Sequence, residues 1–132
     1  MDVKYISKKG EAVDIKKHIV VGKVTNIQDP EKLGRVKVQL PELSDTAETC
    51  WARVVRPSGG PAHGIHFPYE VGDEVLVTFS GGFPEHPFVL GALWSKKTPP
   101  PVEEGKRSDQ RSITSRSGHM IVLDDTPDEP SI

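Results

Sequence analysis

The segment HGIH contains the side chains of this sequence that are best suited to metal chemistry. It places His63 and His66 three residues apart, among glycines and prolines that predict a loop. A zinc site takes three or four protein ligands, so these two imidazoles would need partners such as Glu70, Asp73 or His86. The sequence has no HExxH motif and no paired CxxC motif. We therefore expect exposed loop histidines without a bound metal.

The other residue types that carry out catalysis do not occur in the patterns that catalysis needs. Cys50 is the one cysteine, so the chain has no internal disulfide, and its neighbours predict a small apolar strand residue. No serine lies in a GxSxG motif. Asp124 and Asp125 are adjacent, which directs their side chains apart, so we expect them to solubilise a turn. We predict no catalytic residue and no cofactor; a small carbohydrate-active enzyme is hardly supported.

The segment SGGFPEHP, residues 80–87, has the glycines of a phosphate-binding loop but lacks its other parts. A phosphate loop leads into the N-terminus of a helix and usually contains a lysine. Here the segment leads into FVLGALW, which is typical of a strand, and it contains no lysine. We predict a hairpin turn in which the glycines adopt positive φ angles.

The composition is that of a globular protein built from short elements. Of 132 residues, 35% are hydrophobic and 27% are charged, while 12 glycines and 12 prolines predict many turns. The net charge of −2 lacks the basic excess of a dedicated nucleic-acid binder. No segment has the apolar length of a membrane helix, and the N-terminus has no signal peptide. We expect a protein that is made in the cytoplasm.

The apolar pattern predicts strands and no long amphipathic helix. Val36 and Val38 alternate with polar residues, and so do Val75 and Val77, which predicts that these four side chains face a core. Gly22, within a β-branched run, predicts a bulge or a bend. The predicted strands lie within residues 18–29, 35–41, 50–57, 71–79 and 87–94, with a loop at 57–70.

Five strands separated by regular turns predict an all-β fold, specifically a five-stranded OB-fold barrel. We predict an N-terminal arm at 1–17, the barrel at 18–95, a proline-rich linker at 96–109 and a further β segment at 110–132. An OB barrel can also bind single-stranded nucleic acid through exposed aromatic rings backed by basic residues. The aromatic residues here lack interleaved lysine or arginine in the sequence, so this function is the alternative and no nucleic acid is expected.

The segment at 110–132 carries more apolar side chains than two short strands can bury. An isolated hairpin is marginally stable in water, so these side chains must pack on the barrel or against other copies of the chain. The proline linker favours the second arrangement, because it carries the segment away from the barrel. The predicted interface residues are Ile113, Met120, Ile121, Val122 and Leu123.

The order of these segments resembles a known family. GRVKVQLP, WARV, PYEVGDEVLVTF and HPFVLGALW, followed by a proline-rich linker and RSITSRSGHMIVLDD, occur in the order found in contractile injection system spike proteins. These are the phage baseplate assembly protein V family and the VgrG proteins of type VI secretion. The resemblance covers residues 18 to about 125.

The resemblance implies a structural, non-enzymatic homotrimer. An OB collar would carry a β-prism or β-helix needle that begins at 110–132, caps the tail tube and helps to puncture the target envelope. The implied partners are a hub or baseplate protein, a tail-tube protein, a tip-capping protein and the target membrane. The implied location is a phage virion or a phage-tail-like particle.

The sequence departs from the family pattern in three respects. Only about 17 residues precede the barrel, where VgrG proteins have a hub domain, so we expect a separate hub protein. The sequence ends at Ile132, where a needle would be starting, so we expect a truncated chain or a very short spike. SGGFPEHP replaces the usual Asp-Pro-Asp type turn, and nothing resembles the lysozyme domain of some spikes.

Overall fold

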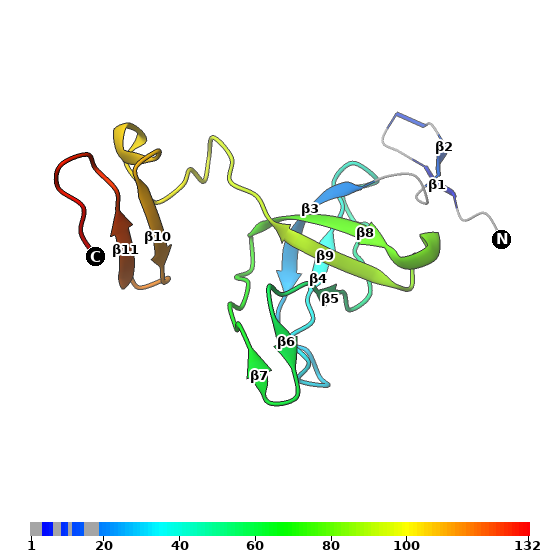
Figure 1. Cartoon of the computed structure of the whole chain (residues 1–132). Coiled ribbons are helices and arrows are strands. Elements are labelled where there is room, and N and C mark those ends of the chain that lie inside the picture. Colours follow the sequence, from blue (N-terminus) through cyan, green and yellow to red (C-terminus); the bar gives the residue numbers. More distant parts are fainter. Residues whose placement is uncertain (1–3, 7–8, 11, 15–18) are drawn as a thin grey trace. The chain divides into compact units, whose positions relative to one another are not determined.

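The structure, a computed structural model, describes residues 4–6, 9–10, 12–14 and 19–132. The chain forms two compact units, Met1–Leu93 and Trp94–Ile132 (Figure 1). The described residues contain strands and short 3₁₀ turns, so the prediction of an all-β protein is confirmed. None of them lies in a helix long and apolar enough to cross a membrane. The domain bounds given above remain predictions.

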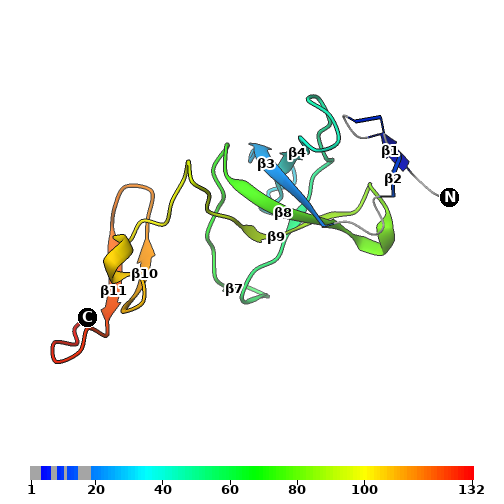
Figure 2. The same cartoon turned by 90° about the horizontal axis from the view of Figure 1, so that it is seen from above.

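The first unit is built on a curled five-stranded sheet with the order β4-β3-β8-β9-β5. Figure 2 shows β3, β8 and β9 side by side in this sheet. Neighbouring strands are antiparallel except β5 and β9, which are parallel. The strands are β3 (Val20–Asn26), β4 (Lys37–Gln39), β5 (Arg53–Val54), β8 (Glu74–Phe79) and β9 (Pro87–Ala92).

The two outer strands of this sheet are joined to each other. Val36, just before β4, and Ala52, just before β5, exchange two backbone hydrogen bonds of 3.1 and 2.7 Å. Thr49 donates its N–H to the Val38 carbonyl at 2.8 Å on the same side. Because a sheet that joins its own edges leaves few unpaired backbone groups, this arrangement supports the predicted OB-type barrel.

Alternating valines fill the inside of the curled sheet. Val36 and Val38 are 3% and 0% exposed, and Val75 and Val77 are both fully buried, as predicted. Phe79 closes the same face of β8, whereas Val71 is 61% exposed, because β8 begins only at Glu74. The core also contains Val20, Val24, Leu40, Leu43, Ala52 and Val89.

Of the bulge or bend predicted at Gly22, the bulge does not form there. The register between β3 and β4 shifts between Val24 and Asn26 instead. At Gly22 the neighbouring strand approaches so closely that a Cβ atom would lie 2.3 Å from Val38 Cγ1 and 2.9 Å from the Gln39 carbonyl oxygen. The glycine is therefore needed for this close approach of β4.

The segment at 80–87 is the turn between β8 and β9, which confirms the prediction. Ser80–Gly82 form a 3₁₀ turn, and Ser80 N–H donates to the His86 carbonyl at 2.9 Å. Gly81 and Gly82 have φ angles of 61° and 76°, which side chains with a Cβ atom rarely adopt. This turn contains no phosphate-binding helix N-terminus.

Two predictions, one of a loop at residues 57–70 and one of a strand at Cys50, are wrong. Residues 57–70 are not loop throughout, because β6 (Gly59–Gly60) and β7 (His63–Gly64) form a small antiparallel hairpin. Cys50 is not a strand residue but an exposed free thiol that lies 3.3 Å from the Glu85 carbonyl oxygen. Cys50 is positioned by contact with a distant segment, whereas β6 and β7 pair locally across two residues and contain no apolar alternation that would predict strands.

The predicted N-terminal arm is only partly within the described residues. β1 (Lys4–Ile6) and β2 (Ala12–Asp14) pair antiparallel, with Tyr5 opposite Val13. Lys9 and Gly10 are also described, and residues 1–3, 7–8, 11 and 15–17 lie outside the part of the chain that the structure describes.

The second unit consists of the predicted linker and one hairpin. The linker is not extended throughout, since Glu104–Lys106 form a 3₁₀ turn, η3. The hairpin contains β10 (Gln110–Thr114) and β11 (Met120–Asp124), which pair antiparallel over their whole length. A β-prism or β-helix would need further strands, so that part of the predicted fold remains a prediction.

Candidate functional site

The β10–β11 hairpin exposes one apolar face. Ile113 lies directly opposite Ile121, and Leu123 lies opposite Arg111, which puts these four side chains on one side of the hairpin. Ile113, Ile121 and Leu123 are 51%, 62% and 45% exposed. These three residues, named the apolar face below, form adjacent cross-strand positions and could pack against a partner.

The five predicted interface residues divide between the two sides of this hairpin. Met120 pairs with Thr114, and Val122 pairs with Ser112, on the side opposite the apolar face. Met120 is 51% exposed, whereas Val122 is half-buried. The pairing register therefore brings together only three of the five residues. This division was predictable, because neighbouring residues of a strand point to opposite sides.

The sheet of the hairpin has two strands, so both edges lack a neighbouring strand among the described residues, although Asp124 at the end of β11 exchanges two backbone hydrogen bonds with Ser131. The outward backbone N–H and C=O groups of an edge strand can pair with another chain. An exposed apolar face and two open edges are the features that favour assembly with other β segments.

A polar cluster fixes the base of the hairpin. Asp124 accepts hydrogen bonds from the Thr126 hydroxyl at 2.5 Å and from the Gln110 amide at 2.8 Å. These hydrogen bonds lower the pKa of the Asp124 carboxyl, and the bond from Thr126 has the largest effect. Asp125 forms a 2.8 Å ion pair with Arg111. The adjacent acids do point apart, as predicted, but they organise the hairpin rather than only solubilise a turn.

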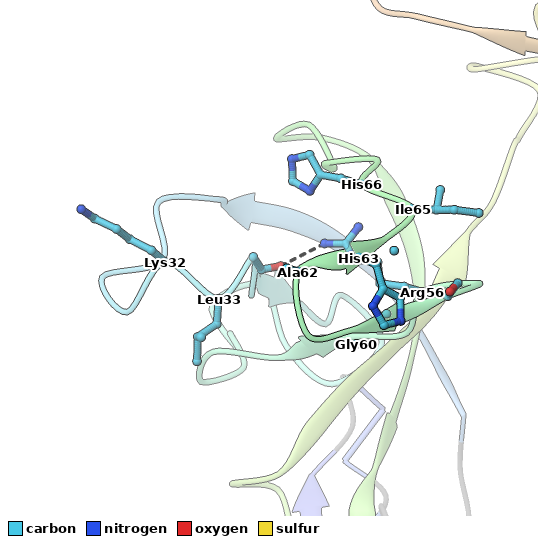
Figure 3. Close-up of a pocket in the computed structure, with 12 residues that line it drawn as sticks. Lys32, Leu33, Arg56, Gly60, Ala62, His63, Ile65 and His66 are labelled. Carbon is cyan, nitrogen blue, oxygen red and sulfur yellow. Dashed lines mark hydrogen bonds between the residues drawn. The ribbon is translucent and has the colours of Figure 1, made fainter.

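The predicted metal-binding histidines do not gather into a metal site. No group of three or more histidine, cysteine, aspartate or glutamate side chains suitable for a metal occurs among the described residues. His63 and His66 instead line a hollow of about 480 Å³ on the barrel unit (Figure 3). His86 lies elsewhere, in the β8–β9 turn, where its ring meets Phe83 edge-on with a centroid separation of 6.3 Å.

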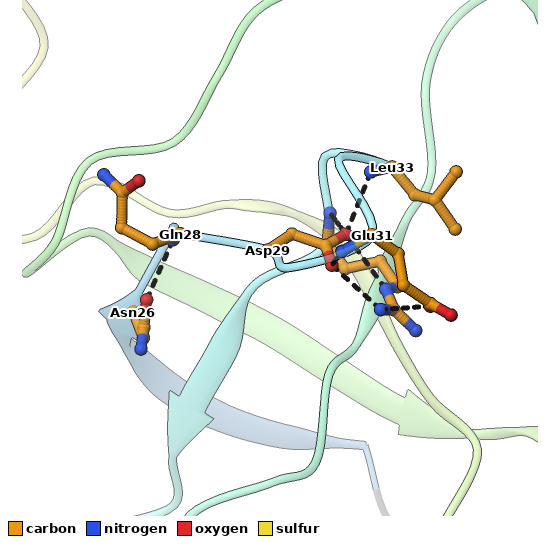
Figure 4. Close-up of polar contacts among 6 residues, drawn as sticks. Asn26, Gln28, Asp29, Glu31 and Leu33 are labelled. Carbon is orange, nitrogen blue, oxygen red and sulfur yellow. Dashed lines mark hydrogen bonds and ion pairs between the residues drawn. The ribbon is translucent and has the colours of Figure 1, made fainter.

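The loop between β3 and β4 is organised by one carboxylate (Figure 4). Asp29 accepts hydrogen bonds from the backbone N–H groups of Glu31, Leu33 and Arg35, at 3.0, 3.1 and 3.1 Å. The Arg35 guanidinium adds two more, from Nε at 3.0 Å and Nη2 at 2.8 Å. The Arg35 side chain, together with these amides, holds the pKa of Asp29 well below its usual range. The loop therefore has a defined shape that one side chain holds.

Two aromatic rings lie next to basic groups, which corrects the expectation from the sequence. Lys37 Nζ lies 5.4 Å from the centre of the Trp51 ring, and Arg53 Cζ lies 5.5 Å from that of Phe88. Both distances are within the range of cation–π attraction. Phe88 and Arg53 are neighbours only because β5 and β9 are paired, so no short sequence window contains this arrangement.

The curled five-stranded sheet is that of a small β protein consistent with the OB class, and the hairpin adds an exposed apolar face. Residues 20–94 match the family described as the type VI secretion system/phage-baseplate injector OB domain. Since this match covers more than half of the 132 residues, the chain belongs to that family.

The chain is also similar to type VI secretion system spike proteins. It is 36% identical to VgrG5 of Pseudomonas aeruginosa over 90 residues, which are 64% of this chain and 11% of that protein. It is 30% identical to VgrG1a of the same organism over 91 residues, which are 66% of this chain and 14% of that protein. It is 34% identical to VgrG3 of Vibrio cholerae over 68 residues, which are 48% of this chain and 7% of that protein. The chain thus spans only a small part of the length of these relatives.

Proposed function

We propose that this chain is a spike protein of a contractile phage-like tail or a type VI-like injection system. Its role is mechanical and non-enzymatic: it caps the tube and helps to puncture the target envelope. The observation that carries this proposal is the exposed apolar face of the hairpin in a chain that also contains the family's OB domain.

In this proposal the working unit is a homotrimer. Ile113, Ile121 and Leu123 of each copy pack against the other copies, which removes their exposed area from water. Met120 and Val122, on the opposite side of the hairpin, join the interface if the strands of three copies wind around one another. Strand pairing between copies also satisfies the open edges of β10 and β11.

The trimer would transmit the force of tail contraction to the target membrane. A hub or baseplate protein and the tail-tube protein are the proposed partners on one side, and a tip-capping protein is the proposed partner on the other. The likeness to type VI spike proteins, at 30% and 36% identity over about two thirds of this chain, supports this assignment.

The solution mass of the full chain tests the proposal. Light scattering coupled to size-exclusion chromatography should give three times the mass of one chain. A monomer at concentrations of about 100 μM would contradict the homotrimer, because an obligate interface of this kind persists well below that concentration.

Single-stranded nucleic-acid binding is the second candidate function. The observation that favours it is the pair of cation–ring contacts, Lys37 with Trp51 and Arg53 with Phe88. Titration with a fluorescent single-stranded oligonucleotide at low salt tests it: binding that weakens as salt rises would support the second function, and no binding would exclude it.

A further inference from the structure

The hollow in Figure 3 lies between the β3–β4 loop and the β6–β7 hairpin. Lys32 and Leu33 line it from the loop, and Ala62 and His63 line it from the hairpin. Its volume of about 480 Å³ lies within the range of small-ligand sites. Nothing in the proposed spike function uses this hollow.

The polar side chains that line the hollow are basic or neutral. Lys32 and Arg56 carry positive charge, and His63 and His66 add imidazole nitrogens. None of the described residues that line it is acidic. The two acids of the adjoining loop, Asp29 and Glu31, share one partner, Arg35, so these three side chains keep one negative charge against the two positive charges of Lys32 and Arg56. The charge of the hollow therefore suits an anion.

Two of these basic side chains are held in place before any ligand binds. The Arg56 guanidinium donates to the Phe67 carbonyl at 2.7 Å and to the Gly34 carbonyl at 3.4 Å. His63 Nδ1 lies 2.9 Å from the Pro61 carbonyl oxygen. The ring packs over Gly60, where a Cβ atom would lie 2.6 Å from it. Because Arg56 uses only part of its five N–H groups, it can still donate to a ligand.

The backbone around the hollow is held in an uncommon conformation. Lys32 and Ala62, on opposite sides, have φ angles of 56° and 58°. Such left-handed conformations cost free energy in residues other than glycine and often occur at binding sites. Here they shape the two segments that supply Lys32 and His63.

Exposed apolar side chains adjoin the basic group. Leu33 is 70% exposed and Ile65 is 45% exposed, and both line the hollow. Basic groups beside exposed apolar side chains are typical of surfaces that bind an anionic head with an apolar part attached. This combination separates the hollow from a purely electrostatic patch.

We propose that this hollow binds the phosphate group of an anionic ligand. Arg56 and Lys32 provide the positive charge, His63 and His66 add imidazole N–H donors, and Leu33 and Ile65 contact the apolar part. The phosphate can belong to a lipid head group or to a soluble molecule. The proposal does not depend on trimer formation or on the spike role.

Binding of two probes by the full chain at pH 6.5 tests this proposal. The first probe is inorganic phosphate, followed by NMR shifts of the backbone amides of residues 58–66. The second is vesicles of phosphatidylglycerol in phosphatidylcholine, followed by co-sedimentation, with pure phosphatidylcholine vesicles as the reference. Binding to the vesicles alone assigns the site to a lipid head group, and binding to inorganic phosphate assigns it to a soluble phosphate as well.

A matched pair of double variants connects binding to the hollow. Lys32→Asn with His66→Gln removes two basic groups, and asparagine tolerates the left-handed backbone at position 32. Lys96→Asn with His86→Gln makes the same change of charge outside the hollow. We expect the first variant to weaken binding at least about fivefold and the second to leave it unchanged.

Three results would overturn the proposal. These are no binding of either probe by the unmodified chain, equal weakening by both double variants, and unchanged binding by the first variant. Melting curves of both variants check that each remains folded, and His66→Gln alone, at an exposed position, repeats the test if the double variant does not fold.

Discussion

Asp29 and Arg35 form a two-point ion pair in which Nε and Nη2 of the guanidinium donate to the two carboxylate oxygens at 3.0 and 2.8 Å. The Asp29 side chain is 3% exposed. The same carboxylate accepts three backbone N–H groups of its loop. One side chain therefore determines the shape of the β3–β4 loop, which adjoins the proposed anion site.

Asp29→Asn should lower the melting temperature at pH 7 by about 5 °C, because charge-assisted hydrogen bonds become weaker neutral ones. The native carboxyl has a lowered pKa, so its contribution to stability is present above the ordinary aspartate pKa of about 3.9 and is lost as pH falls below it. Thermal melts from pH 7 to pH 2.5 should show the difference narrowing below pH 4. Asp128→Asn, at an exposed position, is the control. A constant difference at all pH values would contradict the role of the charge.

Gly22→Ala should destabilise the barrel by about 1–3 kcal/mol, because the added methyl group overlaps Val38 and the Gln39 carbonyl. Chemical denaturation measures this change. Gly91→Ala is the matched control, since Gly91 is also a strand glycine but has no neighbouring atom within 4 Å of the added Cβ. It should change the stability by less than about 0.5 kcal/mol. Equal effects of the two substitutions would mean that the close approach at Gly22 is not what requires the glycine.

Thr49→Val should cost about 1–3 kcal/mol of unfolding free energy. The buried Thr49 hydroxyl accepts the Val38 N–H at 3.1 Å, and valine would leave that buried donor without its partner. Thr49→Ser keeps the hydroxyl and should cost less than the valine substitution. Urea denaturation of both variants gives the comparison, and a valine variant as stable as the unmodified chain would show that this hydrogen bond contributes little.

Ile113→Asp should convert the proposed trimer to a monomer, because it places a charge in the centre of the apolar face. Ile19→Asp makes the same chemical change at a position that is 59% exposed on the barrel unit, and it should leave the mass unchanged. Light scattering of the two variants at equal concentration is the measurement. A trimer that survives Ile113→Asp would place the interface elsewhere.

Deletion of residues 108–132 should leave the barrel folded but weaken or abolish trimer formation, because the core valines belong to the first unit. Circular dichroism should retain the β signal and a cooperative melt, while light scattering should report a monomer. An unchanged trimer after this deletion would exclude the hairpin as the main interface.

Much of the barrel could be predicted from the sequence, because the alternation of apolar and polar residues along a strand shows which side faces the core. In Val36–Leu40 and Val75–Phe79 every second residue is apolar, and every one of these alternate residues is buried. The turn at Ser80–Gly82 was predictable for the same reason, since positive φ angles require glycine. The position of the Cys50 thiol beside the Glu85 carbonyl was not predictable, because it depends on a distant segment. The β6–β7 hairpin is local, but its strands consist of three glycines and one histidine and carry no apolar alternation.

By itself the sequence determined the strands of the five-stranded sheet, the inward faces of two of them, the turn glycines, and the apolar side chains Ile113, Met120, Ile121 and Leu123 that the chain leaves exposed. These properties depend on neighbours that are two residues apart or on the backbone angles of single residues. Only the tertiary structure decided which distant side chains meet: Lys37 with Trp51, Arg53 with Phe88, and Lys32 with Arg56 around one hollow. The physical reason is that strand register and the joining of β4 to β5 bring these positions together, and no local pattern encodes either of them.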